Sequence, residues 1–196
     1  MKAIIVTGLS GAGKTQAVDC LEDMGYYCVD NMPPALIKSF IDLAGNGKGI
    51  DKAAFVIDVR GGKLFDDLKE SLEEMKKDEM DFKILYLEAS DDTLLRRYNE
   101  TRRSHPLSEG GPVAVGLHRE REMLEELRKQ ADYVIDTSNM KSAQLWAEIK
   151  HLLTSEETSD TFIINIMSFG YKRGTPMAAD MVFDMRFIPN PYYVKS

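Results

Sequence analysis

The sequence predicts an α/β fold built on a doubly wound, parallel, five-stranded sheet. Three observations predict it: five short apolar runs rich in β-branched and aromatic residues, helix-like segments between them, and a glycine-rich loop directly after the first run. Near-continuously apolar strands are typical of parallel sheets, because helices cover both faces of the sheet. The five runs are Ala3–Thr7, Tyr26–Val29, Ala53–Val59, Ile84–Leu87 and Tyr133–Ile135.

Helix boundaries occur in the segments between these runs. The first helix should begin at Lys14, directly after the glycine-rich loop, and end at Gly25. Pro33 and Pro34 favour a helix start after the second run, and Ser90 is a typical N-cap residue after the fourth. The alternation of strands and helices supports the doubly wound sheet.

Composition excludes several classes of protein. Of 196 residues, 43% are hydrophobic and 29% are charged, which is the usual balance of a soluble globular chain. A net charge of −7 argues against binding nucleic acid by net charge, so any such contact has to be local. No apolar stretch approaches the 18 residues of a membrane span, and residues 1–7 are too few for a signal peptide. We expect a cytoplasmic protein without membrane contact.

Cysteine and histidine give no sign of a metal site. Cys20 and Cys28 are the only cysteines, and in a chain without a signal peptide we interpret them as reduced packing thiols. His105, His118 and His151 lack the spacing of metal ligands.

A polar stretch near residue 155 divides the chain. We predict a nucleotide-binding domain over residues 1–154, a linker over 155–160 and the incomplete beginning of a C-terminal α/β domain over 161–196. The last part contains two candidate strands, Thr161–Phe169 and Met181–Ile188. Two strands are not stable alone, so this part is expected to pack on the first domain or a partner chain, or to belong to a longer domain.

The glycine-rich loop matches the phosphate-binding pattern G-x-x-x-x-G-K-[ST] at every fixed position. Its glycines let backbone N–H groups point at phosphates, and the dipole of the following helix favours negative charge. Lys14 should reach the β- and γ-phosphates, and Thr15 should bind Mg²⁺. We therefore predict a P-loop NTPase, kinase-like domain that binds a nucleoside triphosphate. The loop residues are Gly8, Leu9, Ser10, Gly11, Ala12, Gly13, Lys14 and Thr15.

Carboxylates follow two of the predicted strands. Asp58 follows an apolar run and is the candidate second magnesium ligand beside Thr15, with Arg60 near enough in sequence to neutralise phosphate charge. The alternative is that Asp58 only caps a turn. Asp30 and Asn31 end the second run at the sheet edge where ligands bind; they either contact a second substrate, magnesium or water, or form an Asx-turn.

Arginines lie on both sides of a glycine- and proline-rich segment between Thr101 and Leu117, where a lid is expected. At 100° per residue, Arg102 falls on the same helix side as Leu94 and Tyr98, whereas Arg96 falls on another. We predict Arg102 as a lid arginine that stabilises transferred phosphate. An ordinary solvated helix is the alternative. The predicted catalytic set is Lys14, Asp58 and Arg102.

The C-terminal part has a possible phosphate-binding patch. Lys172, Arg173 and Arg186 are cationic, and Tyr171 is available for base stacking, so single-stranded RNA is one candidate ligand. A structural ion pair between Asp184 and Arg186 is the competing interpretation.

Taken together, these motifs resemble the RapZ/YvcJ family from one end of the chain to the other. The matching segments are Gly8–Thr15, Tyr27–Pro34, Asp58–Arg60, Thr101–Leu107, Ser168–Lys172 and Ala179–Tyr192.

The resemblance implies a kinase-like N-terminal domain that hydrolyses ATP and GTP, and in some members an RNase-adapter role with RNA binding and sensing of an amino-sugar phosphate. It places ATP at the loop and GTP at Asp58, Val59, Arg60 and Gly61. Family members usually have a polar residue such as Asn at the last of these positions, whereas Gly61 has no side chain to make a contact. The family's small-molecule-binding motifs lie beyond the point where this chain ends.

Three functions are compatible with the sequence. The first is a slow regulatory NTPase that acts on RNA or a regulatory protein, expected to be a homo-oligomer. The second is a small-molecule kinase whose acceptor binds near Asp30. The third is a non-catalytic adapter for RNA or protein in which the nucleotide is structural.

Overall fold

The computed structural model describes residues 1–45, 49–58, 62–101, 104–155, 168–170 and 181–184. The chain divides into two compact units, Met1–Ser159 and Asp160–Ser196. Three of the four residues at 181–184 expose large side chains, Met181, Val182 and Phe183. Most of the two strands expected in the second unit lies outside the described residues, so that expectation stays a prediction. The remaining description concerns the first unit.

A parallel sheet of five strands forms the centre of the first unit, as predicted. The strand order is β2-β3-β1-β4-β5, so β1 lies in the middle, between β3 and β4. The strands are β1 (Lys2–Gly8), β2 (Tyr27–Asp30), β3 (Lys52–Val56), β4 (Phe82–Glu88) and β5 (Tyr133–Asp136). The predicted third strand extended to Val59, but β3 ends at Val56, and Val59 lies outside the described residues.

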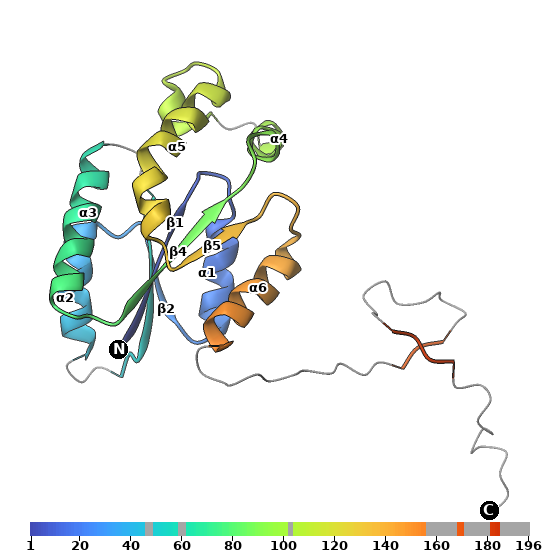
Figure 1. The fold of residues 1–196 in the computed structure, drawn as a ribbon, viewed down its shortest axis with the longest axis horizontal. Helices are drawn as coiled ribbons and strands as arrows, with labels where there is room; N and C mark the ends of the chain where they lie inside the picture. Colours follow the sequence, from blue (N-terminus) through green and yellow to red (C-terminus); the bar gives the residue numbers. More distant parts are fainter. Residues whose placement is uncertain (46–48, 59–61, 102–103, 156–167, 171–180, 185–196) are drawn as a thin grey trace, which may run out of the picture. The chain divides into compact units, whose positions relative to one another are not determined.

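Helices cover both faces of this sheet, with α1 and α6 on one side and α2, α3 and α5 on the other (Figure 1). A short 3₁₀ turn, η1, precedes α5 and packs against it. The helices are α1 (Lys14–Asp23), α2 (Pro34–Gly45), α3 (Gly62–Lys77), α4 (Asp91–Thr101), η1 (Pro106–Ser108), α5 (Val113–Gln130) and α6 (Ser142–Ser155).

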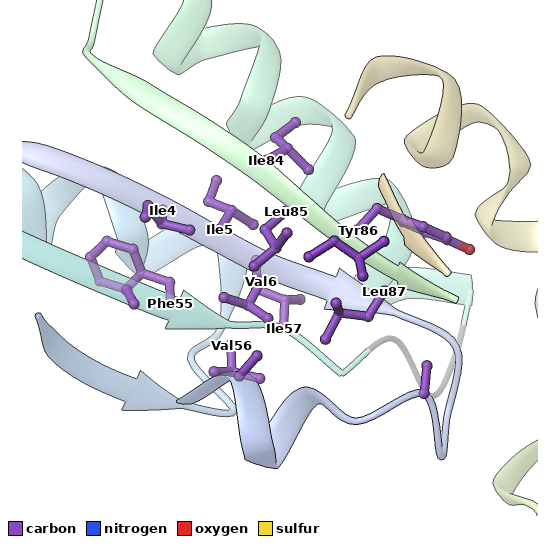
Figure 2. Packing of buried hydrophobic residues seen from close by; sticks show 14 of the residues in the cluster. Ile4, Ile5, Val6, Phe55, Val56, Ile57, Ile84, Leu85, Tyr86 and Leu87 are labelled. Carbon is purple, nitrogen blue, oxygen red and sulfur yellow. The ribbon is translucent and has the colours of Figure 1, made fainter. Parts of the chain in front are cut away.

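The strands are buried on both faces, which explains their continuous apolar sequence. Ile5, Val6 and Phe55 are fully inaccessible, and their side chains pack with those of β4 in one cluster (Figure 2). Burying side chains of this size contributes about 1.5–3 kcal/mol each relative to exposure. The carboxyl end of β1 is therefore held rigidly, and the loop that follows starts from a fixed point.

The start of that loop requires glycine. Gly8 has φ +132° and lies opposite Leu87 of β4, and a Cβ on Gly8 would come within 2.0 Å of the Leu87 carbonyl oxygen. No side chain fits this approach, because the obstacle is main chain within a central strand. Gly8 thus allows the first turn of the loop to pass directly beside β4.

We predict that Gly8→Ala lowers the free energy of unfolding by roughly 3 kcal/mol or more, because main chain has to move. Gly25→Ala is the matched control: Gly25 also has positive φ, +82°, but a Cβ there meets nothing within 4 Å. Only the left-handed backbone cost remains, roughly 1–2 kcal/mol. Urea unfolding measures both variants, and equal losses would contradict the steric explanation.

Candidate functional site

The glycine-rich loop connects the end of β1 to the start of α1 and is anchored from inside the molecule. Leu9 and Ala12 are fully buried. The Leu9 N–H donates to the Leu87 carbonyl at 3.0 Å, and the Ala12 N–H donates to the Leu9 carbonyl at 3.0 Å. These two residues point inward, and the glycines between and after them remain at the surface.

Three backbone donors of the loop are available to a ligand. The N–H groups of Gly11, Gly13 and Thr15 make no hydrogen bond to any described residue. Helix α1 begins at this point without a side-chain cap. Free N–H groups combined with the positive end of a helix dipole form an anion-binding site. The loop is therefore suited to phosphate groups.

Lys14 and Asp58 come together beside these donors. The Lys14 ammonium donates to the Gly8 carbonyl at 2.8 Å and to the Leu9 carbonyl at 3.2 Å, and lies 3.7 Å from Asp58 Oδ1. Both side chains are mostly buried, with 11% and 17% of their surfaces exposed. Partial burial strengthens the attraction between them relative to a surface pair.

A magnesium ion fits the oxygen atoms of this region only in part. Thr15 and Asp58 line one cavity of about 320 Å³, and hydroxyl and carboxylate oxygens are ligands that Mg²⁺ accepts. Among the described residues no group of three or more His, Cys, Asp or Glu side chains is arranged to hold a metal. Thr15 and Asp58 would thus supply only part of the coordination of Mg²⁺, and phosphate and water oxygens have to complete it.

The same cavity contains Asp30 and Asn31 at the end of β2. Asn31 has φ +55°, the left-handed conformation that Asn tolerates better than most residues. The structure therefore brings Asp30 into the same cavity as Lys14 and Thr15 of the phosphate loop. The position suits a second ligand.

Arg97, which was not among the predicted site residues, fastens the loop to the far end of the sheet. Its guanidinium donates to the Gly11 carbonyl at 2.9 Å, to Thr137 Oγ1 at 3.1 Å and to the Thr137 carbonyl at 2.9 Å. Thr137 in turn donates to the Ala12 carbonyl at 2.8 Å. Burial, and to a lesser degree the neighbouring Arg96, lowers the pKa of Arg97 from its usual value.

Two larger hollows border the loop on either side of Arg97. One, of about 630 Å³, lies between the loop and residues of α4 and η1, including Tyr98 and Pro106. The other, of about 380 Å³, lies between the loop and the start of α6, including Gln16 and Lys141. The loop thus faces three cavities, which together can hold an elongated ligand.

Within the segment joining β5 to α6, the Ser138 hydroxyl and N–H both donate to Asp136. The hydroxyl hydrogen bond is the main reason that the pKa of Asp136 is lowered. These bonds order the wall of the 380 Å³ cavity.

Ser10 is directed toward the protein interior. Its N–H and hydroxyl both donate to the buried carboxylate of Glu120 in α5, which also lies 3.2 Å from the ring of His105. Neither Glu120 nor His105 was predicted. Glu120 lies in a charged helical segment of a kind that is usually exposed to solvent. Its contact with Ser10 spans 110 positions, and a single sequence carries no pattern that would indicate such a contact.

Several predicted site residues lie outside the described part of the chain. They are Val59, Arg60, Gly61 and the candidate lid residue Arg102. Their roles stay predictions.

Both cysteines are free, and burial raises the pKa of Cys28 to about 11, so its thiol is protonated at neutral pH. Among the helices that the structure describes, none combines the length and apolar character needed to cross a membrane.

Residues 1–157 match the family described as the RapZ-like N-terminal domain, and residues 162–196 match the RapZ C-terminal domain. A protein of Caldanaerobacter subterraneus named nucleotide-binding protein is 51% identical over 194 residues, covering 99% of this chain and 68% of its own length. A protein of Acetivibrio thermocellus with the same name is 50% identical over 197 residues, covering 100% of this chain and 68% of its own.

Among solved structures, the fold resembles shikimate kinases. The enzyme from Bacteroides thetaiotaomicron aligns with a TM-score of 0.54 and 16% identity, over 77% of this chain and 97% of its own. The enzyme from Acinetobacter baumannii, solved with shikimate, aligns with a TM-score of 0.53 and 19% identity, over 80% of this chain and 95% of its own. At these identities the likeness shows the fold: the first unit has the kinase-like P-loop architecture.

We predict that Arg97→Ala lowers the free energy of unfolding by about 1–3 kcal/mol, because carbonyls of the loop and of Thr137 lose a charged donor. Arg96→Ala is the control, since Arg96 is the exposed neighbour on the same helix; its effect should stay within about 0.5 kcal/mol. Chemical unfolding measures both, and similar values for the two variants would show that Arg97 does not fasten the loop.

Proposed function

The chain belongs to the family with RapZ-like N-terminal and RapZ C-terminal domains, and from that premise we propose that it is a slow, Mg²⁺-dependent NTPase. It binds ATP or GTP and hydrolyses the terminal phosphate with water as acceptor. The observation that carries this proposal is the set of three outward backbone donors at Gly11, Gly13 and Thr15, beside the Lys14–Asp58 pair. An uncapped helix start with an adjacent lysine matches the charge of a triphosphate.

Lys14 has two tasks in this proposal. Without ligand its ammonium is held by the carbonyls of Gly8 and Leu9. A bound triphosphate offers stronger acceptors, so the side chain moves from these carbonyls to the β- and γ-phosphates. Charge developing on the γ-phosphate during transfer is then stabilised by a cation that the enzyme has already placed there.

Thr15 and Asp58 are the residues that would hold Mg²⁺. When bound, the ion would neutralise part of the negative charge of the phosphates. Asp58 also orients the Lys14 side chain across 3.7 Å. Arg102 is proposed as the lid arginine, and Val59, Arg60 and Gly61 as part of the GTP segment, on the grounds given by the sequence.

The base is assigned to the cavity of about 380 Å³ beside α6. This cavity is lined by Gly11, Ala12 and Gly13 of the loop, whereas Lys14, Thr15 and Asp58 line the cavities of about 320 Å³ and 630 Å³. A triphosphate lying across the loop therefore directs its base toward α6 and its γ-phosphate toward Asp58. Gln16, Lys141 and Ser142 are among the polar side chains that line this cavity and could contact the base.

Regulation is proposed as the biological role. Residues 162–196 match the RapZ C-terminal domain, which supports a chain that couples nucleotide state to RNA or a regulatory protein. A homo-oligomer in the cytoplasm is part of the same proposal.

A small-molecule kinase is the second candidate. Asp30 lines the same cavity as Lys14 and Thr15, so a hydroxyl compound held by Asp30 would lie next to the γ-phosphate. An adapter with structural nucleotide is the third, and it predicts that partner binding survives the loss of hydrolysis.

We predict that Lys14→Ala reduces nucleotide hydrolysis by about 100-fold or more while the fold is retained. Loss of the ammonium removes the charge that faces the γ-phosphate, whereas the core contacts remain. Phosphate release and circular dichroism measure the two effects. Lys129→Ala is the control, because Lys129 is exposed on α5 and pairs only with Glu125 among the described residues.

Turnover by Lys14→Ala at the wild-type rate would contradict the site assignment. Loss of nucleotide together with unchanged partner binding would favour the structural-nucleotide adapter.

A panel of sugars and nucleosides incubated with γ-labelled ATP separates hydrolysis from kinase activity. We expect free phosphate equal to the ADP formed and no labelled organic product. A labelled product whose formation is lost in Asp30→Asn would overturn the NTPase proposal in favour of a kinase.

A further inference from the structure

Glu120 is a buried carboxylate that the proposed chemistry does not use. It is 2% exposed, and its two oxygens accept the Ser10 hydroxyl at 2.6 Å and the Ser10 N–H at 2.9 Å. A charge at this depth is stable only when its oxygens are supplied with donors, because water cannot solvate it. Two of the donors come from the phosphate loop, which lies 110 positions away in the sequence.

The third donor is His105, and its tautomer follows from its neighbours. The Leu107 N–H donates to Nδ1 at 3.1 Å, so Nδ1 carries the lone pair. In a neutral ring the proton is then on Nε2, which lies 3.2 Å from Glu120 Oε2 and donates to it. Glu120 therefore receives donors from two separate segments, the loop and the turn before α5.

Packing leaves His105 little freedom to leave this position. Gly116 of α5 lies directly against the ring, and a Cβ there would come within 2.4 Å of Nδ1. The Tyr98 ring of α4 lies 5.3 Å from the His105 ring, centroid to centroid. The Ser108 hydroxyl donates to the His105 carbonyl at 2.8 Å. Helices α4 and α5 and η1 thus all converge on one imidazole.

The consequence for the loop is a fixed orientation at Ser10. Because both Ser10 donors face inward to Glu120, Ser10 contributes none of them to a ligand, and the outward donors begin at Gly11. Arg97 donates to the carbonyl of the next residue, Gly11. Two separate side chains therefore hold the loop before any ligand binds.

We propose that Glu120 is a positioning residue for the nucleotide chemistry described above, on which this inference rests. Through Ser10 it fixes the backbone donors of the phosphate loop, and through His105 it links that loop to the turn that precedes α5. It touches neither the triphosphate nor magnesium.

The negative charge of Glu120 and its positioning role predict opposite effects on nucleotide binding when the charge is removed. A negative carboxylate close to a phosphate site repels the ligand, so removal of the charge alone would strengthen nucleotide binding. Positioning predicts the reverse. Glu120→Gln keeps the side-chain volume but replaces the charge-assisted hydrogen bonds with weaker neutral ones. The amide NH₂ faces either two donors, the Ser10 N–H and the His105 ring, or the Ser10 hydroxyl, which then has to turn and accept.

The test compares Glu120→Gln with Glu122→Gln, a matched control on the same helix whose side chain is exposed and pairs with His118. Amide hydrogen exchange is followed at Ala12, which does not touch Glu120, and at Ile5 in the centre of β1. We expect exchange at Ala12 to rise about tenfold in Glu120→Gln while Ile5 changes less than about twofold, because the loop opens locally. The control should match the wild type.

The second readout is hydrolysis by the folded protein. We expect kcat of Glu120→Gln to fall by about 10- to 100-fold at saturating nucleotide, since small displacements of positioning groups cost this much. Unchanged kcat, tighter nucleotide binding, or equal acceleration of exchange at Ala12 and Ile5 would overturn the proposal. The exchange experiment needs no nucleotide, so an inactive wild type would refute the proposed function without deciding the role of Glu120.

Two further variants keep the test decisive if Glu120→Gln does not fold. Ser10→Ala removes only the hydroxyl bond, and Ala12 exchange should rise by about threefold or more. His105→Asn keeps an acceptor for the Leu107 N–H but removes the donor to Glu120. If the rate of hydrogen exchange at Ala12 is unchanged in His105→Asn, the link between the loop and the turn before α5 is overturned. If the rate is unchanged in Ser10→Ala, the positioning role of Glu120 itself is overturned.

Discussion

The phosphate loop has to leave backbone donors without protein partners, and the rest of the site depends on this constraint. A segment whose N–H groups face outward cannot be held by those groups, so other atoms have to fix it. Gly8 sets its start against β4, and Leu9 and Ala12 bury its inner side. Glu120 takes both donors of Ser10, and Arg97 takes the carbonyl of Gly11. These contacts hold the loop in place although the N–H groups of Gly11, Gly13 and Thr15 have no hydrogen-bond partner among the described residues.

Local charge explains how an acidic chain can offer an anion site. The net charge is −7, yet the loop combines a helix start with Lys14, and this lysine pairs with the carboxylate of Asp58. The buried carboxylate of Glu120 accepts from three donors that offset its charge. In the proposed function, the same Asp58 that orients Lys14 also turns an oxygen toward magnesium.

The sequence predicts the sheet and the loop well because both depend on local patterns. The five strands follow from continuous apolar runs, and the loop follows from fixed spacing of glycine, lysine and threonine. Arg97, Glu120 and His105 escaped prediction for the opposite reason. Arg97 reaches Gly11 across 86 positions and Glu120 reaches Ser10 across 110, and nothing in a single sequence records such pairs. Helical periodicity drew attention to Arg102 instead and set Arg96 on another side of the helix, where it is exposed.

A crystal structure with Mg²⁺ and a non-hydrolysable ATP or GTP analogue tests directly whether the loop binds the triphosphate. We expect phosphate oxygens on the N–H groups of Gly11, Gly13 and Thr15. Lys14 should have moved from the Gly8 carbonyl to the phosphates, and magnesium should lie between Thr15 and Asp58. The base should lie in the cavity beside α6, and Ser10 should remain on Glu120. A nucleotide bound elsewhere, or Lys14 still held by the Gly8 and Leu9 carbonyls in the complex, would contradict it.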